Sequence, residues 1–278
     1  MDHPDFTPEQ PQPERTLDAP EQPAIYPQFP LRVERAVVDL RDVVLVLLVA
    51  FFAIVLCTSI AIGFVAGATG RHVDLQALAG NALITIPAQF AAYVLTVGFM
   101  AWLVRQRHGS GFARGIFWNL PEKQIALTAL AGGAVMAMLS EISSGLLQRW
   151  TPKNLPIEEY FKNAASGYAL ALFGVFVAPV VEELFFRGFL YPALERWIGV
   201  VAGLVLTSAA FSLLHGGQLG EAWAPMLVLF LVSAVLTAVR IRTRSVATCV
   251  LVHMGYNATL FSIMFIYTSG FRHMEKLH

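Results

Sequence analysis

Residues 43–69 read VVLVLLVAFFAIVLCTSIAIGFVAGAT and contain no charged side chain. An α-helix rises about 1.5 Å per residue and the hydrocarbon layer of a bilayer is roughly 30 Å thick, so about 20 apolar residues are needed to cross it. Because this stretch exceeds that length, it predicts a transmembrane helix.

Six further stretches have the same character. Residues 75–104 contain no charge, and residues 124–148 contain only Glu141, which we expect to be structural because it lies near a span end. Together with residues 43–69 they predict an all-α, polytopic transmembrane helical bundle of about seven spans, or eight if a re-entrant segment is present. The remaining four stretches are residues 163–181, 198–214, 222–239 and 245–270.

The composition of the whole chain agrees with this fold class. Hydrophobic residues make up 56% of the chain and charged residues 14%, whereas soluble proteins have about 25% charged residues. The 19 basic and 19 acidic side chains balance, which argues against a nucleic-acid partner. Cys57 and Cys249 lie in apolar stretches and provide no framework for disulfides or a zinc–thiolate cluster.

The chain divides into four parts. Residues 1–31 are rich in proline and predict a disordered cytoplasmic arm, because such a composition cannot build a core. N-terminal transmembrane helices (32–160), a segment carrying the polar motifs (161–270) and a tail (271–278) follow. Lys and Arg near span ends tend to remain cytoplasmic. These residues are more frequent at the span ends that lie on the same side of the membrane as the N-terminus than at those on the opposite side, which predicts a cytoplasmic N-terminus.

Three ionisable residues share one predicted helix: Glu182, Glu183 and Arg187. Each costs about 2.5–3.5 kcal/mol at the bilayer centre, so these side chains must face protein or water rather than lipid. Glu183 and Arg187 lie four residues apart on one helical face and can form an ion pair. Glu182 points about 100° away from Glu183, which leaves its carboxylate available as a general base.

Two histidines, His215 and His253, lie at the end of one apolar stretch and inside another. Asn257 follows His253 by one helical turn on the same face. Helical rise places Glu182 and His215 at similar depths, about 21 and 22 Å from the inner surface, and His253 about 8 Å shallower. We expect helix tilt to close part of this gap.

Several functions fit a carboxylate, an ion pair and two imidazoles inside a membrane. A hydrolytic site uses all of them, whereas a structural ion network would use Glu182, Glu183 and Arg187 to hold helices in register. A proton- or cation-coupled transporter also keeps such groups at mid-membrane, but it predicts inverted repeats that we do not detect in the sequence. A non-catalytic membrane scaffold of the same fold is a further alternative.

Three short motifs carry a resemblance to a known family. They are EELFFR (182–187), FSLLH (211–215) and HMGYN (253–257). In this order and on successive helices, they resemble the motifs of the CPBP family, the CAAX-type and bacteriocin-processing intramembrane proteases related to the eukaryotic prenyl-protein endopeptidase Rce1. The resemblance covers roughly residues 169–261, and the likeness of the chain ahead of it is only architectural.

The resemblance implies an intramembrane endopeptidase. Glu182 would activate the attacking water, His215 and His253 would orient that water or bind a metal, and Asn257 would donate a hydrogen bond to the oxyanion. Glu183 and Arg187 would shape and charge-balance the site. If a divalent metal such as zinc is used, its ligands would be Glu182, His215 and His253, and the base would be another group, such as Glu183.

The resemblance also implies partners and a location. We expect a multi-pass integral protein of a prokaryotic plasma membrane, in contact with lipid and acting on a peptide or protein substrate. A prenylated substrate and a bacteriocin-like substrate both remain open.

Overall fold

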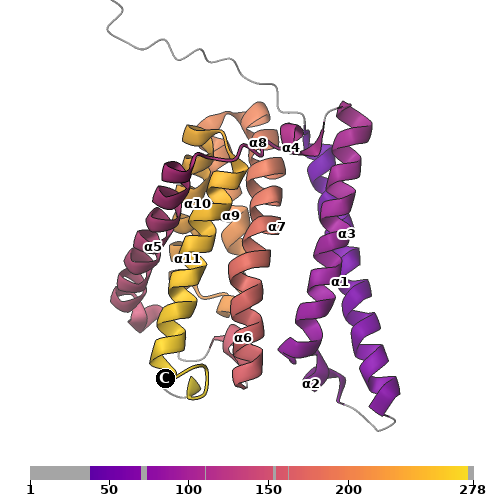
Figure 1. Ribbon diagram of the computed structural model, residues 1–278, viewed down its shortest axis with the longest axis vertical. Helices are drawn as coiled ribbons and strands as arrows, with labels where there is room; N and C mark the ends of the chain where they lie inside the picture. The colour runs from indigo at the N-terminus through magenta and orange to yellow at the C-terminus, as the bar shows by residue number, and fades with distance from the viewer. Residues whose placement is uncertain (1–37, 70–73, 110, 153–154, 162, 275–278) are drawn as a thin grey trace, which may run out of the picture. The chain divides into compact units, whose positions relative to one another are not determined.

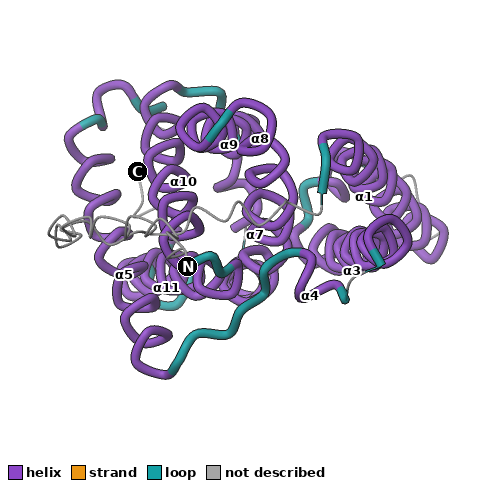
Figure 2. Tube along the Cα trace, turned by 90° about the horizontal axis from the view of Figure 1, so that it is seen from above, coloured by secondary structure: helices purple, strands orange, loops and turns teal. Residues whose placement is uncertain are grey.

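A computed structural model describes residues 38–69, 74–109, 111–152, 155–161 and 163–274, which lie in one compact unit (35–278). The described residues form helices and loops without a β-strand (Figures 1 and 2). This confirms the predicted all-α fold. The predicted arm (1–31) and the last four residues of the predicted tail lie outside the described residues.

In the described part of the chain, six helical runs are long and apolar enough to cross a membrane. A seventh predicted span, residues 198–214, corresponds to a shorter apolar helix, so the expectation of about seven spans agrees with the structure. The six runs are Leu40–Thr69, Ala82–Arg107, Lys123–Leu146, Ala164–Ile198, Trp223–Thr243 and Val246–Tyr267.

Eleven α-helices, two π-helical segments and three 3-10 segments follow one another in the described chain. The α-helices before the polar motifs are α1 (Leu40–Thr69), α2 (Leu75–Ala79), α3 (Ala82–His108), α4 (Phe112–Gly115) and α5 (Lys123–Leu146). The helical run with the first motif comprises α6 (Ala164–Leu172), η3 (Phe173–Val177), α7 (Ala178–Phe185), η4 (Phe186–Leu190) and α8 (Tyr191–Ile198). The remaining α-helices are α9 (Val200–Leu214), α10 (Trp223–Thr243) and α11 (Val246–Tyr267), and the 3-10 segments are η1 (Gln148–Trp150), η2 (Pro156–Phe161) and η5 (Gly216–Leu219).

The predicted span 75–104 is not one helix. It breaks at Gly80 and Asn81 into the short α2 and the long α3. Asn81 caps α3, because its side-chain oxygen accepts the backbone N–H of Leu83 at 3.0 Å. Such a cap satisfies a donor that has no partner inside the helix, so the new helix starts here although the hydropathy continues unbroken.

Helices α1 and α3 lie side by side, and α5, α7, α9, α10 and α11 form a neighbouring group (Figures 1 and 2). Val46 and Met100 are fully buried between elements, whereas Phe51 and Phe64 of the same apolar α1 are 60% and 76% exposed. In water, such exposed aromatic rings would be unfavourable, but in a bilayer they face lipid. The exposure pattern therefore fits an integral membrane protein with many passes.

The run 164–198 is a continuous helix with two wider, π-helical turns, and a proline follows each of them. At the end of η3 the N–H of Ala178 donates to Phe173, five residues back. The next donor in that register would be residue 179 to Gly174, but residue 179 is proline and has no N–H. The carbonyl of Gly174 instead accepts the side-chain amide of Asn257 at 2.7 Å.

The second π turn repeats this pattern. The N–H of Tyr191 donates to Phe186, and the next donor in register would be Pro192 to the carbonyl of Arg187. That carbonyl instead accepts the side-chain Nε of Arg240 at 3.2 Å. A proline ring would also clash with the carbonyl four residues back in a regular α-helix, which the π register relieves. The two side chains thus tie α11 and α10 to the two π turns on either side of residues 182–185.

Candidate functional site

Glu182 and Glu183 lie on α7, between the two π turns, and their environments differ. Glu183 is fully buried, whereas the side chain of Glu182 retains 19% exposure. Because the two residues are neighbours on a helix, their side chains leave its axis in different directions. One carboxylate therefore belongs to the protein interior and the other to an accessible space, as the spacing predicts.

The buried carboxylate of Glu183 is held from two sides. Its Oε1 accepts Nη1 of Arg187 at 2.8 Å, so the ion pair expected from the four-residue spacing is present. The same oxygen lies 2.8 Å from Nδ1 of His253 on α11. Because a buried charge is tolerated only when it is paired and hydrogen-bonded, these contacts account for Oε1, whereas Oε2 has no hydrogen-bond partner among the described residues.

Arg187 is also fully buried and reaches a third helix. Its Nη2 donates to both the backbone carbonyl and the hydroxyl of Ser233 on α10, at 2.8 and 2.7 Å. The guanidinium carbon lies 5.3 Å from the ring centroid of Phe211 on α9, a cation–π distance. Arg187 therefore joins α7, α9 and α10.

The two imidazoles present the same nitrogen to Glu182. His253 uses Nδ1 for Glu183, and its Nε2 lies 3.9 Å from Oε2 of Glu182. His215 uses Nδ1 for the carbonyl of Phe211, at 2.8 Å, and its Nε2 lies 4.0 Å from Oε1 of Glu182. A carbonyl only accepts, so Nδ1 of His215 carries the proton, and in the neutral ring Nε2 is an acceptor.

The predicted depth difference does not keep the two side chains apart, because Nε2 of His253 lies 3.9 Å from Oε2 of Glu182. The estimate treated the chain between Glu182 and Arg196 as a regular α-helix, but Phe186–Leu190 is π-helical. A π turn is wider and advances less per residue than an α turn, so the regular rise overestimates the depth of Glu182. No property of hydropathy distinguishes the two helix types.

Asn257 has a partner that the sequence did not indicate. It lies one turn after His253 on α11, and its amide nitrogen donates to the carbonyl of Gly174. One of the two amide hydrogens is therefore used by the backbone of η3, and the other is available for a further acceptor. The expected oxyanion contact stays a prediction.

Ser233 is the site residue that sequence reasoning missed. It lies in the middle of α10, which carries none of the three motifs, and it is fully buried. Serine is common in transmembrane helices, where its hydroxyl usually bonds within its own helix. Its sequence position therefore gave no signal, and only the three-dimensional structure reveals its contact with Arg187 of η4.

Two imidazole Nε2 atoms and a carboxylate are a chemically suitable donor set for zinc. Their Nδ1 atoms are occupied by an oxygen partner each, as is usual for histidines that bind metals. Across the part of the chain that the structure describes, however, no three His, Cys, Asp or Glu side chains form a preassembled metal site. The three groups are therefore suited to zinc by their chemistry, but as the structure places them they do not form a metal site.

Residues 164–259 match the family described as type II CAAX prenyl endopeptidase Rce1-like. The segment is similar to that family. The match confirms the resemblance drawn from the three motifs, and all six predicted site residues fall within it. The comparisons with curated proteins and with solved structures found no match.

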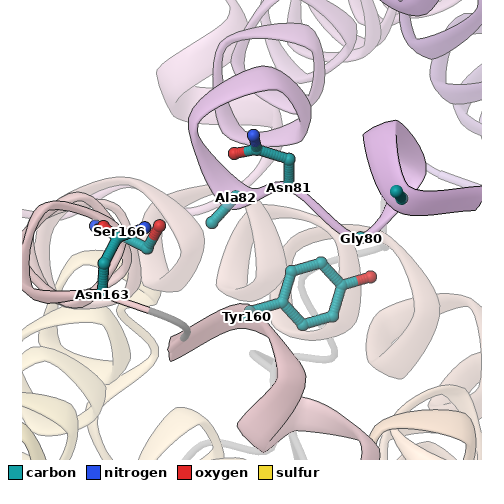
Figure 3. Close-up of a pocket in the computed structure, with 7 residues that line it drawn as sticks. Gly80, Asn81, Ala82, Tyr160, Asn163 and Ser166 are labelled. Atoms are coloured by element: carbon teal, nitrogen blue, oxygen red, sulfur yellow. Dashed lines mark hydrogen bonds between the residues drawn. The ribbon is translucent and has the colours of Figure 1, made fainter. Parts of the chain in front are cut away.

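Two of the hollows among the described residues border the segment that matches this family. An apolar groove of about 360 Å³ lies between α3 and the run from η3 to α7, and Val181, the neighbour of Glu182, is part of its wall. A second cavity of about 260 Å³ lies at the start of α3 and α6 (Figure 3), and Asn81 and Asn163 are part of its lining. None of the six predicted site residues lines either hollow, but Val181 in the wall of the groove adjoins Glu182 in the chain. The apolar groove is therefore the hollow next to the candidate site.

Proposed function

We propose that this protein is an intramembrane endopeptidase that hydrolyses peptide bonds of membrane-associated substrates, with Glu182 as its general base. One observation carries the proposal: two imidazoles from α9 and α11 turn their Nε2 atoms to within 3.9 and 4.0 Å of one carboxylate on α7. The match to an endopeptidase family supports it. These distances exceed those of direct hydrogen bonds, and a bridging water spans such a separation.

In this proposal Glu182 accepts a proton from water while the water oxygen attacks the peptide carbonyl carbon. The C–N bond then breaks, and Glu182 returns the proton to the leaving nitrogen. His215 and His253 orient the water through Nε2, because their Nδ1 atoms are fixed by Phe211 and Glu183. The second amide hydrogen of Asn257 is the proposed donor to the oxyanion.

A divalent metal is a second way in which the same groups could act. If zinc is bound, Glu182, His215 and His253 are the proposed ligands, and the metal would lower the pKa of a bound water. Glu183 would then be the remaining carboxylate near the reacting water. Its contacts with Arg187 and His253 would have to loosen for it to accept a proton.

The groove between α3 and α7 supports a substrate with an apolar part. Phe90, Tyr93 and Phe176 line it together with valines, and it reaches Val181 next to Glu182. A prenyl chain or an apolar peptide segment would have a favourable place there, because lipid-exposed apolar walls bury such groups without leaving polar atoms unpaired.

We propose a cytoplasmic N-terminus and a prokaryotic plasma membrane as the setting.

The test is cleavage of prenylated and unmodified peptides by purified protein in liposomes. Wild type is compared with Glu182→Gln and with Glu141→Gln, a matched control in α5 that changes another acid within a span. We expect Glu182→Gln to lose cleavage and Glu141→Gln to retain it. A chelator that stops cleavage and a zinc salt that restores it would assign the metal route, whereas cleavage by Glu182→Gln at the wild-type rate would disprove the role of Glu182.

The same variants separate this function from its alternatives. A coupled transporter would show ion or solute flux across the liposome membrane that Glu182→Gln abolishes, without any cleavage product. A scaffold would show neither cleavage nor flux in the wild type.

A further inference from the structure

A series of hydrogen bonds connects His253, an imidazole next to Glu182, to Ser233 on α10. Oε1 of Glu183 is shared between Nδ1 of His253 and Nη1 of Arg187, at 2.8 Å from each. Moving the guanidinium therefore moves the oxygen that orients the imidazole. The position of Arg187 thus affects the direction in which His253 presents Nε2 to Glu182.

The second terminal nitrogen of Arg187, Nη2, is hydrogen-bonded to Ser233. Its hydroxyl and its carbonyl oxygen both accept Nη2 of Arg187, at 2.7 and 2.8 Å. The carbonyl also accepts the hydroxyl of Thr237 at 2.9 Å, so it is shared, whereas the serine hydroxyl is the closer oxygen to the arginine. Hydrogen bonds to a charged donor in a dry interior are stronger than neutral ones.

The burial of this pair makes the hydroxyl hard to replace. Ser233 and Arg187 are both fully buried, so water cannot take the place of a lost acceptor. Nε of Arg187 has no hydrogen-bond partner among the described residues, so the hydrogen bonds of the guanidinium run through its two terminal nitrogens. Loss of one of the acceptors at Nη2 would leave the guanidinium free to pivot about its contact with Glu183.

We propose that Ser233 is a positioning residue that acts through Arg187 and Glu183 to hold His253 in its orientation toward Glu182. This inference rests on the proposed function, since it assigns Ser233 to the same site. It gives α10 a role in the site although this helix carries none of the three motifs.

The test compares Ser233→Ala with Ser233→Thr and Ser208→Ala. The alanine variant removes the hydroxyl acceptor, and the threonine variant keeps it. Ser208 is an equally buried serine whose hydroxyl donates to Leu204 in its own helix, so Ser208→Ala controls for loss of a buried hydroxyl. We expect kcat to fall about tenfold in Ser233→Ala with KM unchanged, and to remain within about twofold of wild type in the other two variants.

A second readout does not depend on cleavage. Diethyl pyrocarbonate modifies accessible imidazole nitrogen, and mass spectrometry resolves the two site histidines. The side chain of His253 is 5% exposed and that of His215 is 20% exposed, so His215 is an internal reference. We expect the rate of His253 modification, relative to His215, to rise severalfold in Ser233→Ala only.

The outcomes separate the two proposals. Faster labelling of His253 in Ser233→Ala, with no cleavage by wild type, would support the positioning role and contradict the endopeptidase. Unchanged labelling and unchanged kcat in Ser233→Ala would overturn the positioning role. A lower unfolding temperature without either change would also overturn it, because Ser233 would then be only structural.

Discussion

Replacing Gly133 with alanine should inactivate the site from a distance. Gly133 lies on α5, against the segment of α11 that carries His253. A Cβ built at this glycine would lie 2.7 Å from the backbone nitrogen of Tyr256 and closer still to the carbonyl oxygen of Val252. Both atoms belong to the backbone of α11, so neither can rotate away, and the two helices must separate.

The size of the displacement follows from the closer of those contacts. Non-bonded carbon contacts are optimal at about 3.5–4.0 Å, so relieving the contact with the Val252 carbonyl oxygen moves α11 by about 1.5–2 Å relative to α5. His253 follows Val252 directly, and its Nε2 would move with the backbone. A misplacement of about 1 Å can lower a catalytic rate by about 10²-fold, and overpacking costs about 1–3 kcal/mol of stability. We therefore expect folded but nearly inactive protein.

The assay is the rate of peptide cleavage by Gly133→Ala in liposomes, with thermal unfolding in detergent as a measure of folding. Gly132→Ala is the matched control, because a Cβ at Gly132 meets no atom within 4 Å. It should keep both the wild-type rate and the wild-type unfolding temperature. Full activity of Gly133→Ala would refute the argument that close packing of α5 sets the place of His253.

Three further predictions concern single contacts. Arg187→Lys should lower cleavage at least tenfold, because one ammonium nitrogen cannot contact both Glu183 and Ser233 in the fork geometry of arginine, and wild-type kcat would contradict this. Asn257→Ala should lower the free energy of unfolding by about 1–3 kcal/mol, measured by thermal unfolding, because the Gly174 carbonyl loses its donor. Adding Pro179→Ala restores a backbone N–H and should recover part of that loss. Partial burial opposes ionisation of Asp39, but hydrogen bonds from the backbone of Asp42 and Arg41 hold its pKa below the usual value. The ionised Asp39 should therefore stabilise α1 above about pH 4, and this stabilisation should be lost as the pH falls further. Asp39→Ala should thus destabilise the protein by about 0.5–2 kcal/mol at pH 7 and less at pH 3, and an equal effect at both would count against the assignment.

Hydropathy was sufficient to predict the fold class and most span positions. The stretch 124–148 corresponds to Lys123–Leu146, and 222–239 corresponds to Trp223–Thr243. Hydropathy could not find the break at Asn81, since the break depends on a capping hydrogen bond rather than on a change of polarity. It also could not find the π turns, because hydropathy measures polarity and not the register of the backbone hydrogen bonds.

The candidate site was predictable to the extent that its groups are ionisable. An acid or an imidazole inside a span has a high cost, so Glu182, Glu183, Arg187 and His253 could be selected from the sequence. Ser233 could not be selected in this way, because a hydroxyl can bond to its own helix at little cost. The predicted division of the chain at residue 160 stays a prediction.

The two prolines explain why the site is built on this one helical run. Each deprives a carbonyl of its backbone donor, and each carbonyl is then bonded by a side chain from another helix: Asn257 from α11 at Gly174, and Arg240 from α10 at Arg187. These contacts fix the turn that carries Glu182 against the two neighbouring helices at both of its ends. Asn257 can therefore be required for folding even if it never touches substrate. The double variant Asn257→Ala with Pro179→Ala separates the two roles, because a restored N–H at residue 179 can recover stability but cannot supply an oxyanion donor. Recovery of stability without recovery of cleavage would assign both roles to Asn257, and recovery of both would leave it only the structural one.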